Sequence, residues 1–240
     1  MTEKQIINLP TKQLPIVPLT RQEIYDAAEE RVSLITKEFT NGFHFIAQYP
    51  QSVTIFGSTR ISESNPYYQL ARTIGKKIAE ELHYAVFTGG GPGIMEAANR
   101  GANEAGGQSL GLTIELKNNQ VTNPYLTDHL DFYYFFSRKV SLFFSAEAYV
   151  FFPGGFGTLD ELFEILTLVQ THKIEKLPII LVGSDYWKPL EAFLKNESVS
   201  RDMIELEDLD LYTITDNPDE VINVIRTAPV RNGIRFNHNK

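Results

Sequence analysis

The 240 residues include no cysteine. This absence excludes disulfide bonds, thiolate catalysis and cysteine-based zinc or iron–sulfur sites. Histidine is present but has no metal-ligand spacing such as H-E-x-x-H. We therefore expect neither a metal nor a cofactor at the site of this protein. The five histidines are His44, His83, His129, His172 and His238.

Positive charge and long apolar runs are also scarce. The chain has 22 Lys and Arg against 30 Asp and Glu, a net charge of −8, which argues against broad binding to nucleic acid or anionic membranes. The most aromatic region, residues 132–152, is interrupted by Arg138, Lys139 and Glu147, so we expect no membrane span. The N-terminus lacks the basic-then-apolar order of a signal peptide. These features predict a soluble, cytoplasmic protein.

Short apolar runs alternate with helical patterns from residue 51 to about residue 225. This alternation predicts a single α/β domain, a Rossmann-like, doubly wound parallel sheet with helices on both faces. The predicted strands are Ser52–Phe56, Tyr84–Phe87, Ser109–Leu116, Leu130–Phe136, Ala148–Phe152, Leu177–Val182 and a last one near Tyr212–Thr215. The predicted helices of this domain are Pro66–Leu82, Ile94–Ala105, Ser137–Ser145, Leu159–Thr171, Trp187–Leu194 and Pro218–Ile225.

Two flanking segments complete the predicted organisation. Residues 1–50 form an N-terminal arm and a helix that runs from Thr20 to about Gln48, opened by a capping box of Thr20 and Glu23. Residues 51–225 form the Rossmann-like domain, and residues 226–240 form a basic tail. We expect the helix to pack on the core or on a second subunit.

The loop Pro153–Thr158 joins a buried strand to a helix and contains three glycines. Glycines leave backbone N–H groups uncovered, and such a loop at a helix N-terminus can bind phosphate. Glu161 follows in the first helical turn, where it can act as a catalytic carboxylate. Alternatively, Thr158 and Glu161 form a capping box, and the glycines only allow a tight turn.

A second glycine loop, Gly89–Gly93, follows another strand. It fits neither the dinucleotide fingerprint G-x-G-x-x-G nor a Walker A loop, which disfavours nicotinamide and P-loop chemistry. The carboxyl ends of parallel strands share one edge of the sheet. We therefore expect four segments to meet at that edge, namely the two glycine loops, the loop Gly57–Arg60 and residues 137–139.

Arg138 begins a predicted helix, where a cation is unfavourable against the helix dipole. It therefore needs an anionic ligand or an ion pair with Asp160 or Glu161. Its neighbour Lys139 is the better candidate for a solvated charge.

Three motifs carry a family resemblance: G-G-G-P-G-I-M-E-A-A-N-R-G-A at 89–102, S-R-K at 137–139 and P-G-G-F-G-T-L-D-E at 153–161. Together they resemble the LONELY GUY (LOG) family, often mislabelled lysine decarboxylase. The resemblance covers roughly residues 52–195, and the N-terminal helix is similar to the longer branch of that family.

The resemblance implies hydrolysis of the N-glycosidic bond of a purine nucleoside 5′-monophosphate, either AMP or a cytokinin riboside monophosphate. It implies Arg138 and Glu161 as the catalytic pair, a homodimer and a role in cytokinin biosynthesis. The base, adenine or N6-prenylated adenine, stays open. The implied substrate-binding residues are Gly57, Ser58, Gly90, Gly91, Gly93, Met95, Lys139, Gly154, Gly155, Gly157 and Thr158.

Two alternative functions use the same fold. A nucleotide carrier or sensor would bind the nucleotide with the same two glycine loops and would not cleave it. Such a protein would not need an acid beside the ribose. Decarboxylation with pyridoxal phosphate would need a lysine for a Schiff base, and no lysine stands out.

Overall fold

The computed structural model describes residues 20–115 and 122–229. The predicted arm (1–18), part of the predicted loop 117–127 and most of the predicted tail lie outside these residues. The helices are α1 (Arg21–Ile46), α2 (Pro66–Lys77), α3 (Ile94–Glu104), α4 (Phe135–Ser145), α5 (Phe156–Gln170), α6 (Ser184–Phe193) and α7 (Pro218–Thr227), with the short helices η1 (Ile78–Leu82), η2 (Leu194–Ser198), η3 (Val199–Arg201) and η4 (Leu206–Leu211). The strands are β1 (Ser52–Phe56), β2 (Ala85–Thr88), β3 (Ser109–Ile114), β4 (Asp128–Phe132), β5 (Ala148–Phe151), β6 (Ile179–Leu181) and β7 (Thr213–Ile214).

The seven strands form one parallel sheet in the order β4-β3-β2-β1-β5-β6-β7. The chain moves outward from β1 to β4 and then returns to place β5 on the other side of β1. The strand order therefore reverses between β1 and β5. In open α/β sheets this reversal marks the place where ligands bind, outside the carboxyl ends of the strands.

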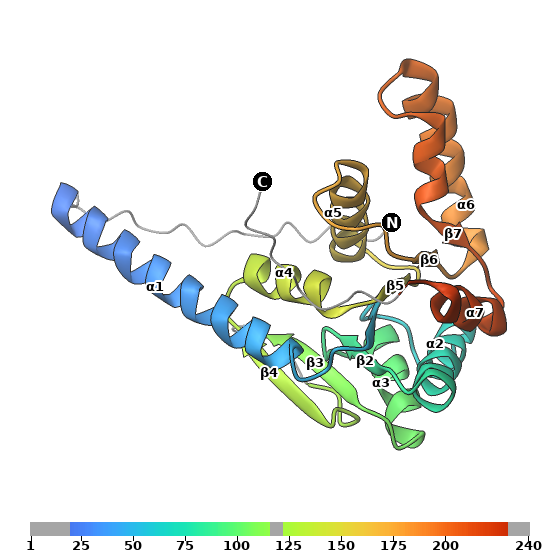
Figure 1. Cartoon of the computed structure of the whole chain (residues 1–240), viewed down its shortest axis with the longest axis horizontal. Helices are drawn as coiled ribbons and strands as arrows, with labels where there is room; N and C mark the ends of the chain where they lie inside the picture. Colours follow the sequence, from blue (N-terminus) through green and yellow to red (C-terminus); the bar gives the residue numbers. More distant parts are fainter. Residues whose placement is uncertain (1–19, 116–121, 230–240) are drawn as a thin grey trace, which may run out of the picture. The chain divides into compact units, whose positions relative to one another are not determined.

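Strands β1, β2, β3, β5 and β6 are buried on both faces, as their apolar sequences require, whereas the edge strand β4 is mostly exposed. On one face, side chains such as Phe56 and Phe151 pack against α4, α5 and α6. On the other face, side chains such as Val53 and Val150 pack against α2, α3 and α7. Figure 1 shows this division, with α4 and α5 on one side of the sheet and α2, α3 and α7 on the other. The predicted α/β class and the parallel sheet are confirmed.

Helix α1 crosses a boundary between two units of the chain, residues 1–37 and residues 38–240. In the first unit the predicted capping box is present, because Thr20 N–H donates to Glu23 Oε2 (2.7 Å) and Glu23 N–H donates to Thr20 Oγ1 (3.2 Å). Two of the apolar residues that predicted this helix, Ile24 and Val32, are exposed. The second unit holds the end of α1 and the whole sheet.

One strand prediction is wrong. The aromatic run to Phe136 was expected to be strand throughout, but β4 ends at Phe132 and α4 begins at Phe135. The backbone N–H groups of Tyr133 and Tyr134 donate to the carboxylate of Glu38 instead of continuing the sheet. The apolar pattern could not show this, because the partner lies about a hundred residues earlier in the chain.

No helix within the described ranges has both the length and the apolar character needed to cross a membrane.

Candidate active site

A pocket of about 650 Å³ lies at the edge of the sheet where β1 and β5 end. Its size falls within the range of small-molecule sites. The four loops expected to meet at this edge all contribute to it, so their predicted convergence is confirmed. The lining residues are Phe56, Gly57, Ser58, Thr59, Arg60, Gly89, Met95, Ile114, Phe135, Arg138, Gly155, Phe156, Gly157, Thr158, Leu159 and Glu161.

The start of α5 differs from the capping-box alternative. The helix begins at Phe156, three residues earlier than predicted, and its N-cap is Gly155 without any side-chain cap. Thr158 is buried in the first turn. The capping box of Thr158 and Glu161 is therefore wrong, which leaves the first amides of α5 open and Glu161 free for another use.

The glycines of this loop serve two different purposes. A Cβ on Gly154 would lie 2.2 Å from Thr158 Oγ1, so the packing of the loop itself requires glycine there. A Cβ on Gly155 or Gly157 would meet no atom of a neighbouring segment within 4 Å among residues 20–115 and 122–229. Because both line the pocket, their missing side chains leave room for a molecule bound against the helix N-terminus.

Glu161 has the most perturbed carboxyl group of the pocket. Desolvation raises the pKa of Glu161 to about 7, the positive charge of Arg138 lowers it in part, and Asp160 raises it further. Its carboxylate accepts no hydrogen bond from any described residue. A carboxyl group with a pKa near neutrality, lining a pocket and without a structural partner, is typical of a catalytic acid or base.

Arg138 projects from the first turns of α4 into the same pocket. Its Nε–H donates to the backbone oxygen of Leu112 at 2.7 Å, which fixes the plane of the guanidinium. Desolvation lowers the pKa of Arg138, and the nearby charge of Glu161 raises it in part. The side chains of Arg138 and Glu161 therefore influence each other through their charges, although they form no direct ion pair within the described part of the chain. The expected alternative, an ion pair of Arg138 with Asp160 or Glu161, is not formed.

Lys139 lies outside the pocket lining. Its Nζ donates to Asp160 Oδ2 at 2.8 Å and also pairs with Glu164, both on α5. Lys139 is therefore an ion-paired residue between two helices rather than a solvated charge.

The second glycine loop contributes to the pocket mainly through Gly89 and Met95. A Cβ on Gly89 would lie 2.0 Å from Nη2 of Arg138, so glycine is needed there to make room for the guanidinium. Gly90 and Gly93 have positive φ angles of 70° and 73°, which the turn requires. Of the glycines predicted in this loop, Gly90, Gly91 and Gly93 shape the turn and do not line the pocket.

Buried amides hold this loop in place. Asn123 N–H donates to Gly90 O at 2.9 Å, and its Nδ2 donates to Gly91 O at 3.1 Å and to Asn99 Oδ1 at 3.0 Å. Thr88 donates to the same Asn99 oxygen at 2.6 Å and accepts from the N–H of Gly90. Fully hydrogen-bonded buried networks of this kind make a loop rigid.

Eight of the predicted residues line the pocket, and several lining residues were missed. The eight are Gly57, Ser58, Met95, Arg138, Gly155, Gly157, Thr158 and Glu161. Lys139, Gly90, Gly91, Gly93 and Gly154 lie outside the lining. The most important residue missed is Arg60, which was not named as a site residue although it ends the predicted loop Gly57–Arg60; a cation in that loop was a usable signal.

The fold and the pocket define a Rossmann-like protein with a ligand site at the reversal point of its sheet. A family model described as "Possible lysine decarboxylase" matches residues 95–225, more than half of the chain. The chain belongs to this family, which is the LOG family indicated by its motifs. No lysine of the described residues lines the pocket, so the pocket offers no residue for the Schiff base that decarboxylation with pyridoxal phosphate needs.

Known proteins similar to this chain include nucleotide-cleaving enzymes and proteins of the same fold. The cytokinin riboside 5′-monophosphate phosphoribohydrolase of Rhodococcoides fascians is 28% identical over 152 residues, 62% of this chain and 77% of the relative. A pyrimidine/purine nucleotide 5′-monophosphate nucleosidase of Escherichia coli is 29% identical, over 62% of this chain and 35% of the relative. Among solved structures, the molybdenum cofactor binding protein of Rippkaea orientalis matches with a TM-score of 0.55 at 22% identity, over 73% and 94% of the chains, which shows the fold alone.

Proposed function

We propose that this chain hydrolyses the N-glycosidic bond of a purine nucleoside 5′-monophosphate to a free base and ribose 5-phosphate. The observation that carries the proposal is Glu161, a carboxyl group without a structural partner whose pKa is raised to about 7 and which shares a pocket with Arg138. The names of the two relatives, a phosphoribohydrolase and a nucleosidase, support the same reaction.

The roles of the two residues follow from the chemistry of the bond. Cleavage passes through an oxocarbenium-like state on the ribose, as in glycoside hydrolysis. The Glu161 carboxylate stabilises this cation and takes a proton from the attacking water. Arg138, held by Leu112 O, stabilises the negative charge that develops on the departing base.

The 5′-phosphate is proposed to lie at the open N-terminus of α5, opposite Arg60. The amides of residues 155–158 have no side-chain cap, and Gly155 and Gly157 leave space in front of them. Arg60 lines the same pocket, and its guanidinium has no hydrogen bond or ion pair with any described residue. Ser58 N–H donates to Pro153 O at 3.0 Å, which holds the loop of Arg60 against the loop of α5. A dianionic phosphate is matched by a cation and open amides.

We also propose that the chain forms a homodimer through the surface beside the pocket. Phe156 is 93% exposed and Phe163 is 38% exposed on the same helix, and both line a shallow groove along α5. Exposed apolar side chains grouped in this way mark interaction surfaces. Location in the cytoplasm and a role in cytokinin biosynthesis stay predictions that rest on composition and on the motifs.

The test is base release from AMP and from isopentenyladenosine monophosphate, comparing wild type with Glu161→Gln. This change keeps the size of the side chain and removes the carboxylate. We expect wild type to release base and the folded variant to be at least about 100-fold slower. The faster substrate identifies the preferred base. Binding of both nucleotides without release of either base would contradict the proposal and favour a carrier.

A further inference from the structure

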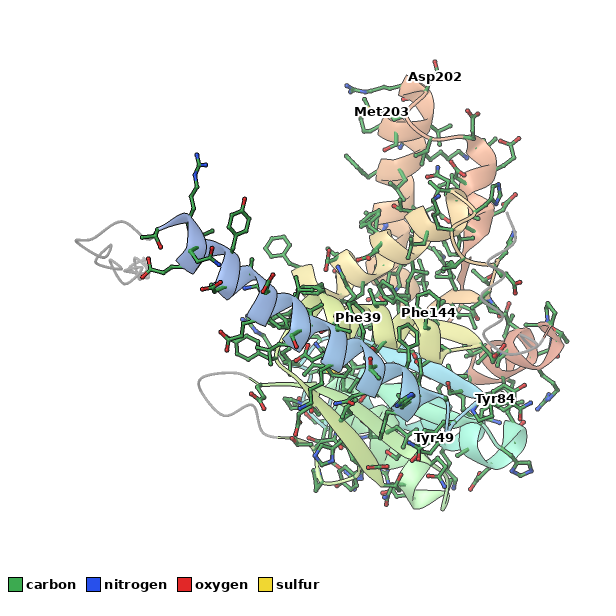
Figure 2. All side chains as sticks on the ribbon, turned by 60° about the vertical axis from the view of Figure 1, so that its left-hand side comes forward. Phe39, Tyr49, Tyr84, Phe144, Asp202 and Met203 are labelled. Atoms are coloured by element: carbon green, nitrogen blue, oxygen red, sulfur yellow. The ribbon has the colours of Figure 1, made fainter. Side chains whose placement is uncertain are left out.

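The last turns of α1 run alongside α4 in the same direction. The rings of Phe39 and Phe136 lie 6.3 Å apart between centroids, and those of Phe43 and Phe144 lie 5.5 Å apart. Phe39 and Phe144 are labelled in Figure 2, along the line where α1 passes α4. Because residue numbers rise together along both helices, the residue directly before Phe39 lies beside the N-terminus of α4.

Glu38 occupies that place. Its carboxylate accepts hydrogen bonds from Tyr133 N–H at 2.6 Å, Tyr134 N–H at 3.3 Å and Ser137 Oγ at 2.5 Å. The N-cap residue of α4, Tyr134, supplies no side-chain cap of its own. Glu38 therefore caps α4 from another helix, with its negative charge at the positive end of the α4 dipole.

Gly42, one helical turn after Glu38, allows this approach. A Cβ at Gly42 would lie 2.5 Å from Ser141 Oγ and 3.1 Å from Cζ of Phe132. Residues four apart lie on the same helix face, so the glycine and the carboxylate face α4 together. The close contact at Gly42 thus brings Glu38 within hydrogen-bonding distance of α4.

The turn that Glu38 caps is the turn that carries Arg138. The backbone N–H of Arg138 donates to Tyr134 O at 3.3 Å, and Ser137 directly precedes it. We propose that Glu38 is a positioning residue that holds the first turn of α4, and with it the Arg138 guanidinium, beside Glu161. The proposal rests on the proposed function only for the statement that Arg138 takes part in catalysis.

The direct test is the titration of the Glu161 carboxyl group, followed by ¹³C NMR in glutamate-labelled protein and assigned with Glu161→Gln. The charge of Arg138 lowers the pKa of Glu161. If Glu38→Gln releases Arg138, the titration midpoint of Glu161 rises, by about half a pH unit or more. If Glu38 acted only through its own negative charge, its removal would lower the midpoint. The direction in which the Glu161 midpoint moves therefore distinguishes the two explanations.

Two controls complete the experiment. Glu23→Gln removes the carboxylate that caps α1 itself and is expected to leave the midpoint unchanged. In an Arg138→Ala background, Glu38→Gln is expected to cause no further rise, because the two residues act together. A folded Glu38→Gln variant whose midpoint is equal to or below that of wild type would overturn the proposal.

Activity gives a second readout. We expect Glu38→Gln to lower kcat for base release about tenfold or more, with KM changed less than about threefold, because a small displacement of a catalytic group lowers the rate of the chemical step. If Glu38→Gln does not fold, Gly42→Ala serves as the second variant, because it keeps the carboxylate but pushes α1 away from Ser141. We expect Gly42→Ala to raise the titration midpoint of Glu161. An unchanged midpoint in Gly42→Ala would also overturn the proposal. If wild type releases no base, the proposed function fails, while the titration still decides the role of Glu38.

Discussion

Individual residues of the site owe their properties to their surroundings more than to their type. Three cations, Arg60, Arg138 and Lys139, lie near one pocket. Lys139 is neutralised by two carboxylates of α5, and Arg138 is held by a backbone oxygen, whereas Arg60 has no partner among the described residues. The three residues are therefore expected to respond differently to substitution.

The pH dependence of the reaction reports on Glu161. The base form of Glu161 is needed, and its pKa is raised to about 7. We expect kcat/KM to fall about tenfold per pH unit below a midpoint near 7 and to level off above it. Asp160 raises this pKa, so Asp160→Asn should move the midpoint to lower pH. A profile flat from pH 5 to 8 would contradict the assignment of Glu161 as base.

Arg60→Gln tests the phosphate site. The change removes a charge-assisted contact, and we expect KM for the nucleoside 5′-monophosphate to rise about 10- to 100-fold. Cleavage of the same nucleoside without its phosphate should be unaffected. The control is Arg201→Gln, which changes the charge by the same amount. Arg201 is exposed and paired with Glu197. If Arg60→Gln weakened cleavage of the nucleoside and of its 5′-monophosphate equally, Arg60 would not contact the phosphate.

The helices that border the site begin where distant residues allow them to begin. Helices α4, α5 and α6 each start two or three residues before the predicted position. Glu38 caps α4, and Asp216 accepts from the N–H groups of Gly183 and Ser184 at the start of α6. Neither cap is near its helix in sequence, so local patterns could not locate them.

The glycine loop after β2 acts as one element with Arg138. In Gly89→Ala the new Cβ would displace Nη2 of Arg138, and we expect kcat to fall about 100-fold. The variant should remain folded, since the contact is with the end of a flexible side chain. In an Arg138→Ala background, Gly89→Ala should lower kcat only slightly. Equal losses in both backgrounds, measured by base release, would show that the loop acts independently of Arg138.

The whole molecule is predicted to contain two copies of the chain. Phe163 lines the groove on α5 but not the substrate pocket. Phe163→Glu should therefore shift sedimentation from dimer to monomer at micromolar concentration. Phe193→Glu changes an exposed phenylalanine on α6 and is the matched control. A wild-type monomer, or a variant that stays dimeric, would exclude this surface as the interface.

The sequence by itself determined the fold class and the pair of catalytic candidates. Alternating apolar runs and helical patterns require a parallel sheet, and the carboxyl ends of its strands must share one edge, so Arg138 and Glu161 were expected together. The shared edge follows from local periodicity and a general rule of topology, whereas the catalytic role of the two residues was implied by the family resemblance of their motifs.

Only the tertiary structure decided which of these residues face the pocket and which support it. Gly155 and Gly157 open onto the pocket, whereas Gly154 serves the packing of its own loop and Gly93 allows the close approach of Ser58 and Thr59. Contacts between segments far apart in the chain decide the two ion pairs of Lys139 and the cap of α4. They also decide that Arg60 has no partner among the described residues. Burial, too, exists only in the folded molecule, and burial is what raises the pKa of Glu161 toward neutrality.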